Sequence, residues 1–134
     1  MDSAQLRDLT ERFTEAFNRN DLDGVMAHFA EDAIYEEFNG RQSRGKAAIR
    51  EAFVPQFRGD FGKIHFHTEN LFVDLDSAQA LIRWVCTLER EGRSGGWRGL
   101  DILRFEEGLV KEKLTYAKAK APLIEADTGQ GSAR

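Results

Sequence analysis

The stretch RFTEAFNRNDLDGVMAHFAEDAIYEEFNGRQSRGKAAIREAF, residues 12–53, changes its apolar spacing from that of helices to that of a strand and back. Apolar residues three and four positions apart predict an amphipathic helix over residues 3–19. A second short helix is expected after Asp21, a good N-cap residue. Its apolar face would carry the next four large apolar residues, namely Leu22, Val25, Met26 and Phe29.

The second half of this stretch predicts one strand and one further helix. Residues 34–38 have the composition of a short strand, and NGRQSRG, residues 39–45, has that of a turn. A third helix is expected to begin near Gly45. It should end at about Val54, because Pro55 disfavours helical geometry in the residue before it.

The remainder of the chain is rich in strand-forming residues separated by turn signals. LDSAQ and EEG are typical of turns, and EGRSGG is typical of a hairpin loop. The strands are expected at residues 63–73, 79–90, 97–105 and 109–118. Helices first and an antiparallel meander second is the pattern of an α+β domain.

Length and composition restrict the class of protein. The 134 residues suit one domain over residues 1–120, and ADTGQGSAR within residues 121–134 has the composition of a disordered tail. The net charge of −4, with no block of like charge, argues against a nucleic-acid partner. The single cysteine excludes an intrachain disulfide, and no apolar run has the length of a membrane span. The N-terminus lacks the apolar core of a signal peptide, so we expect a cytoplasmic protein without membrane contact.

Two strands place acidic residues where one face of the sheet is apolar. Glu36 and Glu37 are neighbours and must point to opposite faces, so one of them faces whatever covers the sheet. On the strand at 97–105, Asp101 shares a face with three large apolar residues, Trp97, Leu103 and Phe105. Leu100 and Ile102 lie on the other face. A homodimer through this outer face would cover them, and a modestly apolar solvated face is the alternative.

The order of elements and three motifs resemble those of the nuclear transport factor 2-like, or SnoaL-like, superfamily. The motifs are NDLDGVMAHFAEDA, GKAAIREAF and the meander ending in GLDILRFEEGLVKEKLTYAKA. The resemblance covers roughly residues 5–118. It implies a curved, mostly antiparallel sheet forming a cone, with three helices of the N-terminal half closing an apolar pocket. The superfamily includes ketosteroid isomerase, polyketide cyclases, limonene epoxide hydrolase, scytalone dehydratase and proteins without known catalysis, so fold alone does not fix the chemistry.

Similarity to ketosteroid isomerase implies roles for several positions. It implies that Glu37 stands at the general base and Asp101 at the protonated aspartate of the oxyanion hole. Phe13 and Phe53 stand where that enzyme has tyrosines. Because a phenylalanine cannot donate a hydrogen bond to an oxyanion, isomerisation of 3-ketosteroids in its known form is not expected.

The parity of the strands defines a candidate pocket with an apolar wall and few polar groups. The candidate catalytic residues are Glu37, Asp101 and Tyr116. The candidate ligand-binding residues are Phe13, Phe17, Phe29, Tyr35, Phe53, Trp84, Cys86, Leu88, Trp97, Leu103 and Leu114. Each catalytic candidate has a structural alternative: a rim charge for Glu37, a pairing with a tyrosine, indole or arginine for Asp101, and a core aromatic for Tyr116.

Other reactive residues are given structural interpretations. His65 and His67 share a strand face with Glu69 and could share a metal, but a polar outer face is favoured and no metal site is predicted. Arg98 and Asp101 lie on opposite faces, which excludes the Asp-Arg-Asp arrangement of limonene epoxide hydrolase. Cys86 lies between apolar neighbours, as inert core thiols do.

Two functions remain open from the sequence. The first is a cofactor-independent acid–base enzyme that isomerises, cyclises or dehydrates an apolar small molecule. Glu37 would take a proton next to a carbonyl, and protonated Asp101 would stabilise the enolate with help from Tyr116. The second is a non-catalytic small-molecule-binding or dimerisation domain of the same fold.

Overall fold

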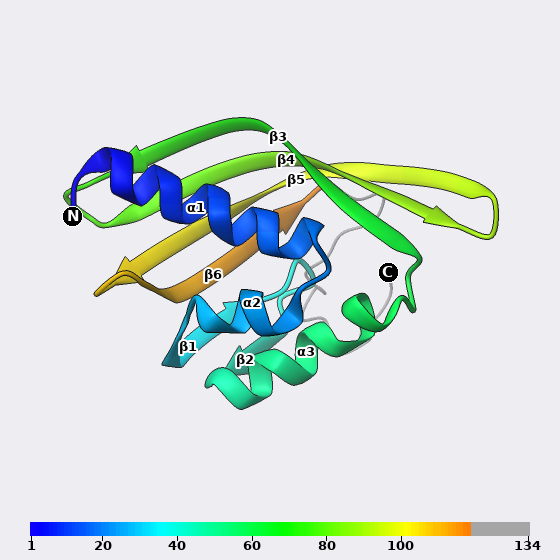
Figure 1. Ribbon diagram of the computed structural model, residues 1–134, viewed down its shortest axis with the longest axis horizontal. Helices are drawn as coiled ribbons and strands as arrows, with labels where there is room; N and C mark the ends of the chain where they lie inside the picture. Colours follow the sequence, from blue (N-terminus) through cyan, green and yellow to red (C-terminus); the bar gives the residue numbers. More distant parts are fainter. Residues whose placement is uncertain (119–134) are drawn as a thin grey trace, which may run out of the picture.

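The computed structural model describes residues 1–118, which form three helices and a six-stranded sheet (Figure 1). The helices are α1 (Ser3–Asn18), α2 (Leu22–Ala27) and α3 (Lys46–Arg58). The strands are β1 (Phe29–Glu36), β2 (Gln42–Arg44), β3 (Lys63–Asp74), β4 (Gln79–Arg90), β5 (Arg93–Glu106) and β6 (Leu109–Ala117). The tail expected at residues 121–134 lies outside the described residues.

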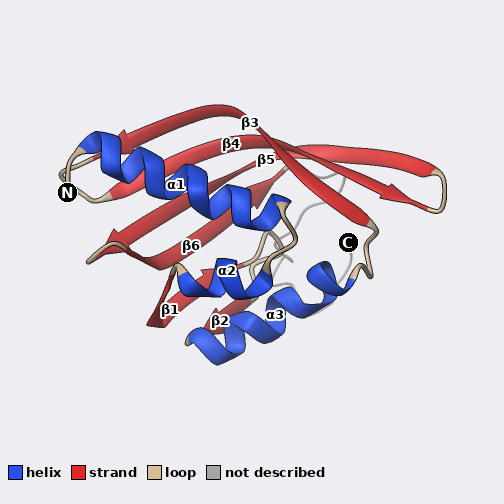
Figure 2. Ribbon diagram, viewed as in Figure 1, coloured by secondary structure: helices blue, strands red, loops and turns tan. Residues whose placement is uncertain are grey.

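The sheet is curved, unclosed and mostly antiparallel. Its strand order is β2-β1-β6-β5-β4-β3, and only the pairing of β1 with β6 is parallel. All three helices lie on the same side of the sheet, with α1 packed along β3 and β4 and with α2 and α3 beside β1 and β2 (Figure 2). The predicted α+β architecture, with helices covering one face of a curved sheet, is confirmed.

Local capping explains where the first two helices begin. Asp2 and Gln5 form a capping box, in which each side chain accepts a hydrogen bond of 2.8 Å from the other residue's backbone N–H. Asp21 accepts a 2.9 Å bond from the backbone N–H of Gly24, which confirms its predicted role as the N-cap of α2. Caps of this kind contribute about 1 kcal/mol each to stability.

Two predicted helix ends were wrong, because tertiary contacts override the local signals. Phe29 begins β1 instead of ending α2: the backbone N–H of Val110 on β6 donates to the carbonyl of His28, and strand pairing takes over there. Helix α3 continues through Pro55 to Arg58. The turn after Pro55 brings Phe57 against the ring of Phe17, 5.7 Å away between centroids, and this packing offsets the missing backbone donor.

Two segments predicted as turn or loop are partly strand. Gln42–Arg44 forms β2, which pairs with Ile34–Glu36 of β1. The hairpin loop between β4 and β5 is shorter than predicted, because β5 already begins at Arg93. Gly96 pairs with Thr87 so closely that a Cβ atom there would overlap the carbonyl oxygen of Cys86. Gly96, which resembles part of a loop signal, therefore permits close strand pairing.

Phenylalanine side chains make much of the core between the helices and the sheet. Phe13 meets Phe17 and Phe29 edge to face at 5.2 and 5.4 Å between centroids, and Phe17 meets Phe53 at 5.2 Å. Such pairs contribute roughly 0.5–1.5 kcal/mol beyond the burial of their area. They join α1, β1 and α3 at one point.

The outer face of the sheet carries both apolar and charged side chains. Leu100, Ile102 and Leu114 are half-buried there, and Phe72 and Tyr116 are 59% and 50% exposed. No helix among residues 1–118 has the length and apolarity needed to cross a membrane.

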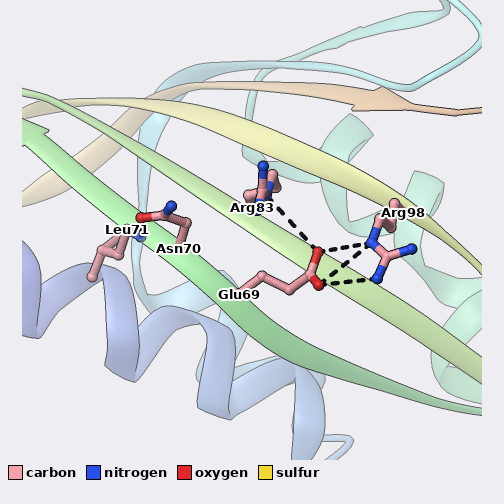
Figure 3. Close-up of polar contacts among 5 residues, drawn as sticks. All are labelled: Glu69, Asn70, Leu71, Arg83 and Arg98. Atoms are coloured by element: carbon pink, nitrogen blue, oxygen red, sulfur yellow. Dashed lines mark hydrogen bonds and ion pairs between the residues drawn. The ribbon is translucent and has the colours of Figure 1, made fainter.

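A three-residue ion cluster lies on this outer face at a bulge in β3. Glu69 is the extra residue between Thr68 and Asn70 in the pairing of β3 with β4. Its carboxylate reaches across β4 to Arg98, with N–O distances of 3.1–3.4 Å, and lies 3.8 Å from Arg83 (Figure 3). The hydrogen bonds from Arg98 lower the pKa of the Glu69 carboxyl, and the charges of both arginines add to that effect.

Candidate functional site

Helices α1 and α3 and the concave face of the sheet enclose a pocket of about 570 Å³. This is within the size range of small-molecule sites in proteins. Its wall comes from α1, α3, four strands of the meander, the end of β1 and two loops. The apolar part of that wall is made by Phe13, Phe17, Phe38, Ala52, Phe53, Phe61, Ile64, Phe66, Trp84, Cys86, Leu88, Trp97 and Ala117, and the polar part by Thr14, Tyr35, Glu37, Asn39, Gln56, Arg90, Asp101, Lys113 and Thr115.

A buried polar network forms one part of this wall. Asp101 accepts hydrogen bonds from Lys113 Nζ at 3.0 Å, from Thr115 Oγ1 at 2.6 Å and from Trp84 Nε1 at 3.2 Å. The side chains of Lys113 and Asp101 are only 6% and 12% exposed. Three hydrogen bonds to one carboxyl group, one of them from an ammonium group, are the pairing that a buried acid needs.

The oxyanion-hole role predicted for Asp101 requires a protonated acid. A protonated aspartic acid would offer a hydrogen to the ligand, whereas this carboxylate faces donors on both of its oxygens. The anticipated structural pairing with an indole is present through Trp84. The cation in the pair is Lys113, which sequence reasoning did not include.

Lys113 also faces three aromatic rings of the pocket. Its Nζ lies 4.7 Å from the centroid of Tyr35, 5.6 Å from that of Phe17 and 5.9 Å from that of Phe53. Tyr35 and Phe53 are stacked, with 4.7 Å between centroids. These distances fit cation–π attraction, which stabilises an ammonium group where water is scarce.

Glu37 lies in the pocket wall, directly after β1. Its backbone N–H donates to the carbonyl of Arg41, which fixes the turn that leads into β2. Glu36 lies on the opposite side and accepts a 3.0 Å hydrogen bond from Gln42 at the surface. Within residues 1–118 the carboxylate of Glu37 accepts no hydrogen bond, unlike that of Asp101. Burial raises the pKa of Glu37, and the positive charges of Arg41 and Lys113 oppose the rise only in part.

Two other titratable groups of the wall are neutral near pH 7. Burial raises the pKa of the Tyr35 phenol well above its usual value, and the negative charges of Asp101 and Glu37 add to this effect. Burial also raises the pKa of the Cys86 thiol to about 11. Neither group is an anionic nucleophile in this setting.

The structure brings most of the predicted site residues together. Glu37 and Asp101 lie in the wall, as do Phe13, Phe17, Tyr35, Phe53, Trp84, Cys86, Leu88 and Trp97. Four predicted residues lie elsewhere. Phe29 and Leu103 are buried in the core, at 1% and 0% exposure, and Leu114 and Tyr116 belong to the outer face of β6.

A β-bulge explains both the misplaced residues of β6 and the missed lysine. Arg104 pairs with Glu112 and Phe105 pairs with Val110, so Lys111 has no partner on β5. The extra residue reverses the parity of the strand after it. Lys113 and Thr115 therefore point into the pocket, and Leu114 and Tyr116 point out.

The histidine pair does not form a metal cluster with neighbouring residues. The rings of His65 and His67 are 4.5 Å apart on β3, and His67 Nε2 lies 3.0 Å from Thr87 Oγ1. Glu69 is turned toward the arginines instead. In the part of the chain that the structure describes, no group of three or more His, Cys, Asp or Glu side chains has the arrangement of a metal site.

Comparison with known families agrees with the fold. Residues 10–113 match the SnoaL-like domain, and the chain belongs to this family.

Solved structures extend the similarity over most of the chain. A "putative polyketide cyclase" from Xanthomonas campestris pv. campestris has a TM-score of 0.75 and 19% identity, with 86% of this chain and 91% of that chain covered. A nuclear transport factor 2-like protein of unknown function from Mesorhizobium loti has a TM-score of 0.73 and 22% identity, with 87% and 93% covered. A second "putative polyketide cyclase", from Pseudomonas putida KT2440, has a TM-score of 0.71 and 17% identity, with 84% and 91% covered. At these identities the similarity shows a shared fold, and function must be argued from the site.

Proposed function

We propose that this protein is an acid–base enzyme that moves a proton on an apolar small molecule bound in the pocket. The observation that carries the proposal is the state of Glu37. Its carboxylate lies in a largely aromatic wall, accepts no hydrogen bond within residues 1–118 and has a raised pKa. A general base works best when its pKa lies nearer to the working pH than that of an exposed glutamate does.

The proposed step is removal of a proton from carbon next to a carbonyl group. Glu37 takes the proton, the electrons of the C–H bond form a carbon–carbon double bond, and the carbonyl oxygen becomes an enolate. Return of the proton to another carbon gives isomerisation. Attack of the enolate carbon on a second carbonyl gives ring closure, and loss of a β-hydroxyl group as water gives dehydration. Two of the similar structures are named for cyclases, which is one of these outcomes.

The test is exchange of carbon-bound hydrogen in deuterated water. Wild-type protein is incubated with a panel of enolisable aryl ketones and 1,3-diketones, and loss of the α-proton signal is followed by NMR. We expect Glu37→Gln to lower the exchange rate by roughly 10²–10⁴-fold, the usual contribution of a general base. Glu36→Gln is the matched control, because its side chain lies on the opposite side. Equal exchange in wild type and Glu37→Gln would rule out this role.

A non-catalytic binding domain is the second candidate. It is favoured by Phe13 and Phe53, which supply pocket wall but no proton donor. In that case aryl ketones would bind, as measured by quenching of tryptophan fluorescence, without any exchange above that of buffer.

We also propose that the outer face of the sheet forms a homodimer. The support is the row of half-buried apolar side chains at Leu100, Ile102 and Leu114, next to exposed Phe72 and Tyr116. Analytical ultracentrifugation should give a dimer for wild type and a monomer for Ile102→Glu. Ala48→Glu adds the same charge on an exposed position of α3 and should leave the dimer intact. A monomeric wild type would disprove the proposal.

A further inference from the structure

Lys113 is a buried cation in the pocket wall, and the proposed proton removal by Glu37 does not itself require it. We propose that Lys113 is a second catalytic residue, whose free N–H group hydrogen-bonds the oxygen that becomes negative when the substrate loses its proton. This inference rests on the proposed function and deepens it, because it assigns Lys113 as the group that stabilises the enolate oxygen of the carbonyl substrate.

A count of donors supports this role. An ammonium group has three N–H donors and no acceptor. Two of them are used, by Asp101 Oδ1 at 3.0 Å and Thr115 Oγ1 at 2.7 Å. Within residues 1–118 the third has no oxygen acceptor. The ammonium nitrogen lies over the rings of Tyr35, Phe17 and Phe53, all of which line the pocket. An oxygen of a bound ligand is the partner that would complete its hydrogen bonding.

The partners of Asp101 keep Lys113 in place. Trp84 donates to one carboxylate oxygen, and Thr115 donates to the other while it accepts from Lys113, so both oxygens of Asp101 are held beside the ammonium group. Residues Asp101 and Thr115 lie opposite each other on β5 and β6, so strand pairing fixes the distance between them. Asp101 is therefore a positioning residue in this scheme, since it orients the ammonium group and offers no hydrogen to the ligand. Donors fixed before the reaction stabilise a developing charge without reorganisation.

Lys113 and Glu37 make a complementary pair of reacting groups in one pocket. Both residues line the same pocket, and the positive charge of Lys113 opposes the rise that burial causes in the pKa of Glu37. A negative base and a positive hydrogen-bond donor facing the same cavity suit a substrate whose proton leaves as its carbonyl oxygen gains charge. A hydrocarbon or a simple ether offers no oxygen that gains such charge, so these classes would not be substrates.

The test uses an ionisable ligand and does not depend on turnover. 2-Naphthol resembles an enolate when it loses its phenolic proton, and absorbance distinguishes its two forms. It is titrated with pH while bound to Glu37→Gln protein, whose neutral side chain mimics the glutamic acid formed after proton removal. We expect the bound phenol to ionise at a pH at least one unit lower than it does when bound to Glu37→Gln/Lys113→Met, which is a tenfold difference in its ionisation constant.

Two further variants separate this role from a folding defect. Lys111→Met removes a lysine two positions earlier on β6 that does not line the pocket, and it should leave the titration unchanged in the Glu37→Gln background. Asp101→Leu/Lys113→Met removes both charges of the buried pair, so no carboxylate is left unpaired, and it should behave as Lys113→Met does. Circular dichroism checks that each variant is folded.

The outcomes distinguish this inference from the proposed function. If naphthol ionises at the same pH with and without Lys113, or does not bind the Glu37→Gln protein, the inference is overturned, whatever the exchange assay gives. If the tenfold difference appears but Glu37→Gln exchanges protons as wild type does, Lys113 binds oxyanions and the role of Glu37 as the base is lost.

Discussion

Lys113 Nζ lies 3.0 Å from Asp101 Oδ1 across the β5–β6 pairing, and both side chains are almost removed from solvent. Burial of a charge is expensive unless the charge is paired, so each of these residues makes the other tolerable. The same ion pair contributes to the stability of the sheet and to the polarity of the pocket. Measurements of unfolding report its contribution to stability separately from its effect on ligands.

Removal of one partner should destabilise the fold strongly. Lys113→Met leaves the carboxylate of Asp101 without its cation, and we expect the free energy of unfolding to fall by about 3–5 kcal/mol. Urea denaturation followed by circular dichroism measures this change. Asp101→Leu/Lys113→Met should lose less than Lys113→Met alone, because apolar replacements of both partners leave no buried charge.

A partly exposed ion pair on the same two strands provides the control. Arg104 and Glu112 are 3.2 Å apart, and about a third of each side chain is exposed. Glu112→Gln should therefore change the free energy of unfolding by less than about 1 kcal/mol. If Glu112→Gln and Lys113→Met lowered the free energy of unfolding by similar amounts, burial would not be what makes the Lys113–Asp101 pair costly to break.

Much of the fold follows from local signals in the sequence. The Asp21 cap, the apolar spacing of α1 and the alternation along β3 to β6 are short-range patterns, and each predicts its element without knowledge of the rest. The predicted ends of α2 and α3 were wrong for the opposite reason. Val110 and Phe17, which decide those two regions, are far away in the sequence.

In the candidate site, too, local signals were readable from the sequence and contacts between distant residues were not. Asp101 could be selected because an acid between apolar neighbours needs a partner or a function. Its partner could not be identified, because the bulge at Lys111 reverses which residues of β6 face the pocket. The available signal was the pairing of an unusual acid on one strand with a lysine on the next strand. That signal becomes useful only when the register between the two strands is known.

The pH dependence of exchange should reflect the raised pKa of Glu37. A general base acts in its ionised form, so kcat/KM for proton exchange should rise with pH on an acid limb centred above 4.5, the ordinary value for glutamate. A pH profile of exchange measured by NMR locates this limb. An acid limb centred at or below 4.5 would mean that burial does not raise the pKa of Glu37.

The raised pKa of Glu37 should also make the stability of the protein depend on pH. Because Glu37 holds its proton more tightly in the folded chain than in the unfolded chain, the folded state binds more protons between the two pKa values. The free energy of unfolding of wild type should therefore fall, relative to that of Glu37→Gln, as pH rises from 4.5 to the raised value. Above this window the difference should stay constant. Denaturation midpoints of the two proteins over a pH series measure it, and a constant difference at every pH would contradict the shift.

Cys86 should report occupancy of the pocket. Its thiol has a pKa of about 11 against an ordinary value of 9.0, so at pH 8 its thiolate fraction is lower by about 100-fold. We expect the native protein to react with a thiol-specific disulfide reagent at least about 100-fold more slowly than the urea-unfolded protein does. Since the chain has no other cysteine, the signal is specific to this site. A bound ligand should slow the native reaction further, and native reactivity equal to that of the unfolded chain would exclude a buried thiol.

Gly99 should be required for the position of the Trp84 indole. The two residues lie opposite each other on β4 and β5, and a Cβ atom at position 99 would overlap both the indole ring and the carbonyl oxygen of Tyr116. Gly99→Ala should move the indole away from Asp101, lower the free energy of unfolding by about 1–3 kcal/mol and change the tryptophan fluorescence spectrum. Gly95→Ala is the matched control, because a Cβ atom there meets no atom within 4 Å and the same strand is substituted. Denaturation and emission spectra of both variants test the prediction, which fails if Gly99→Ala is as stable as Gly95→Ala.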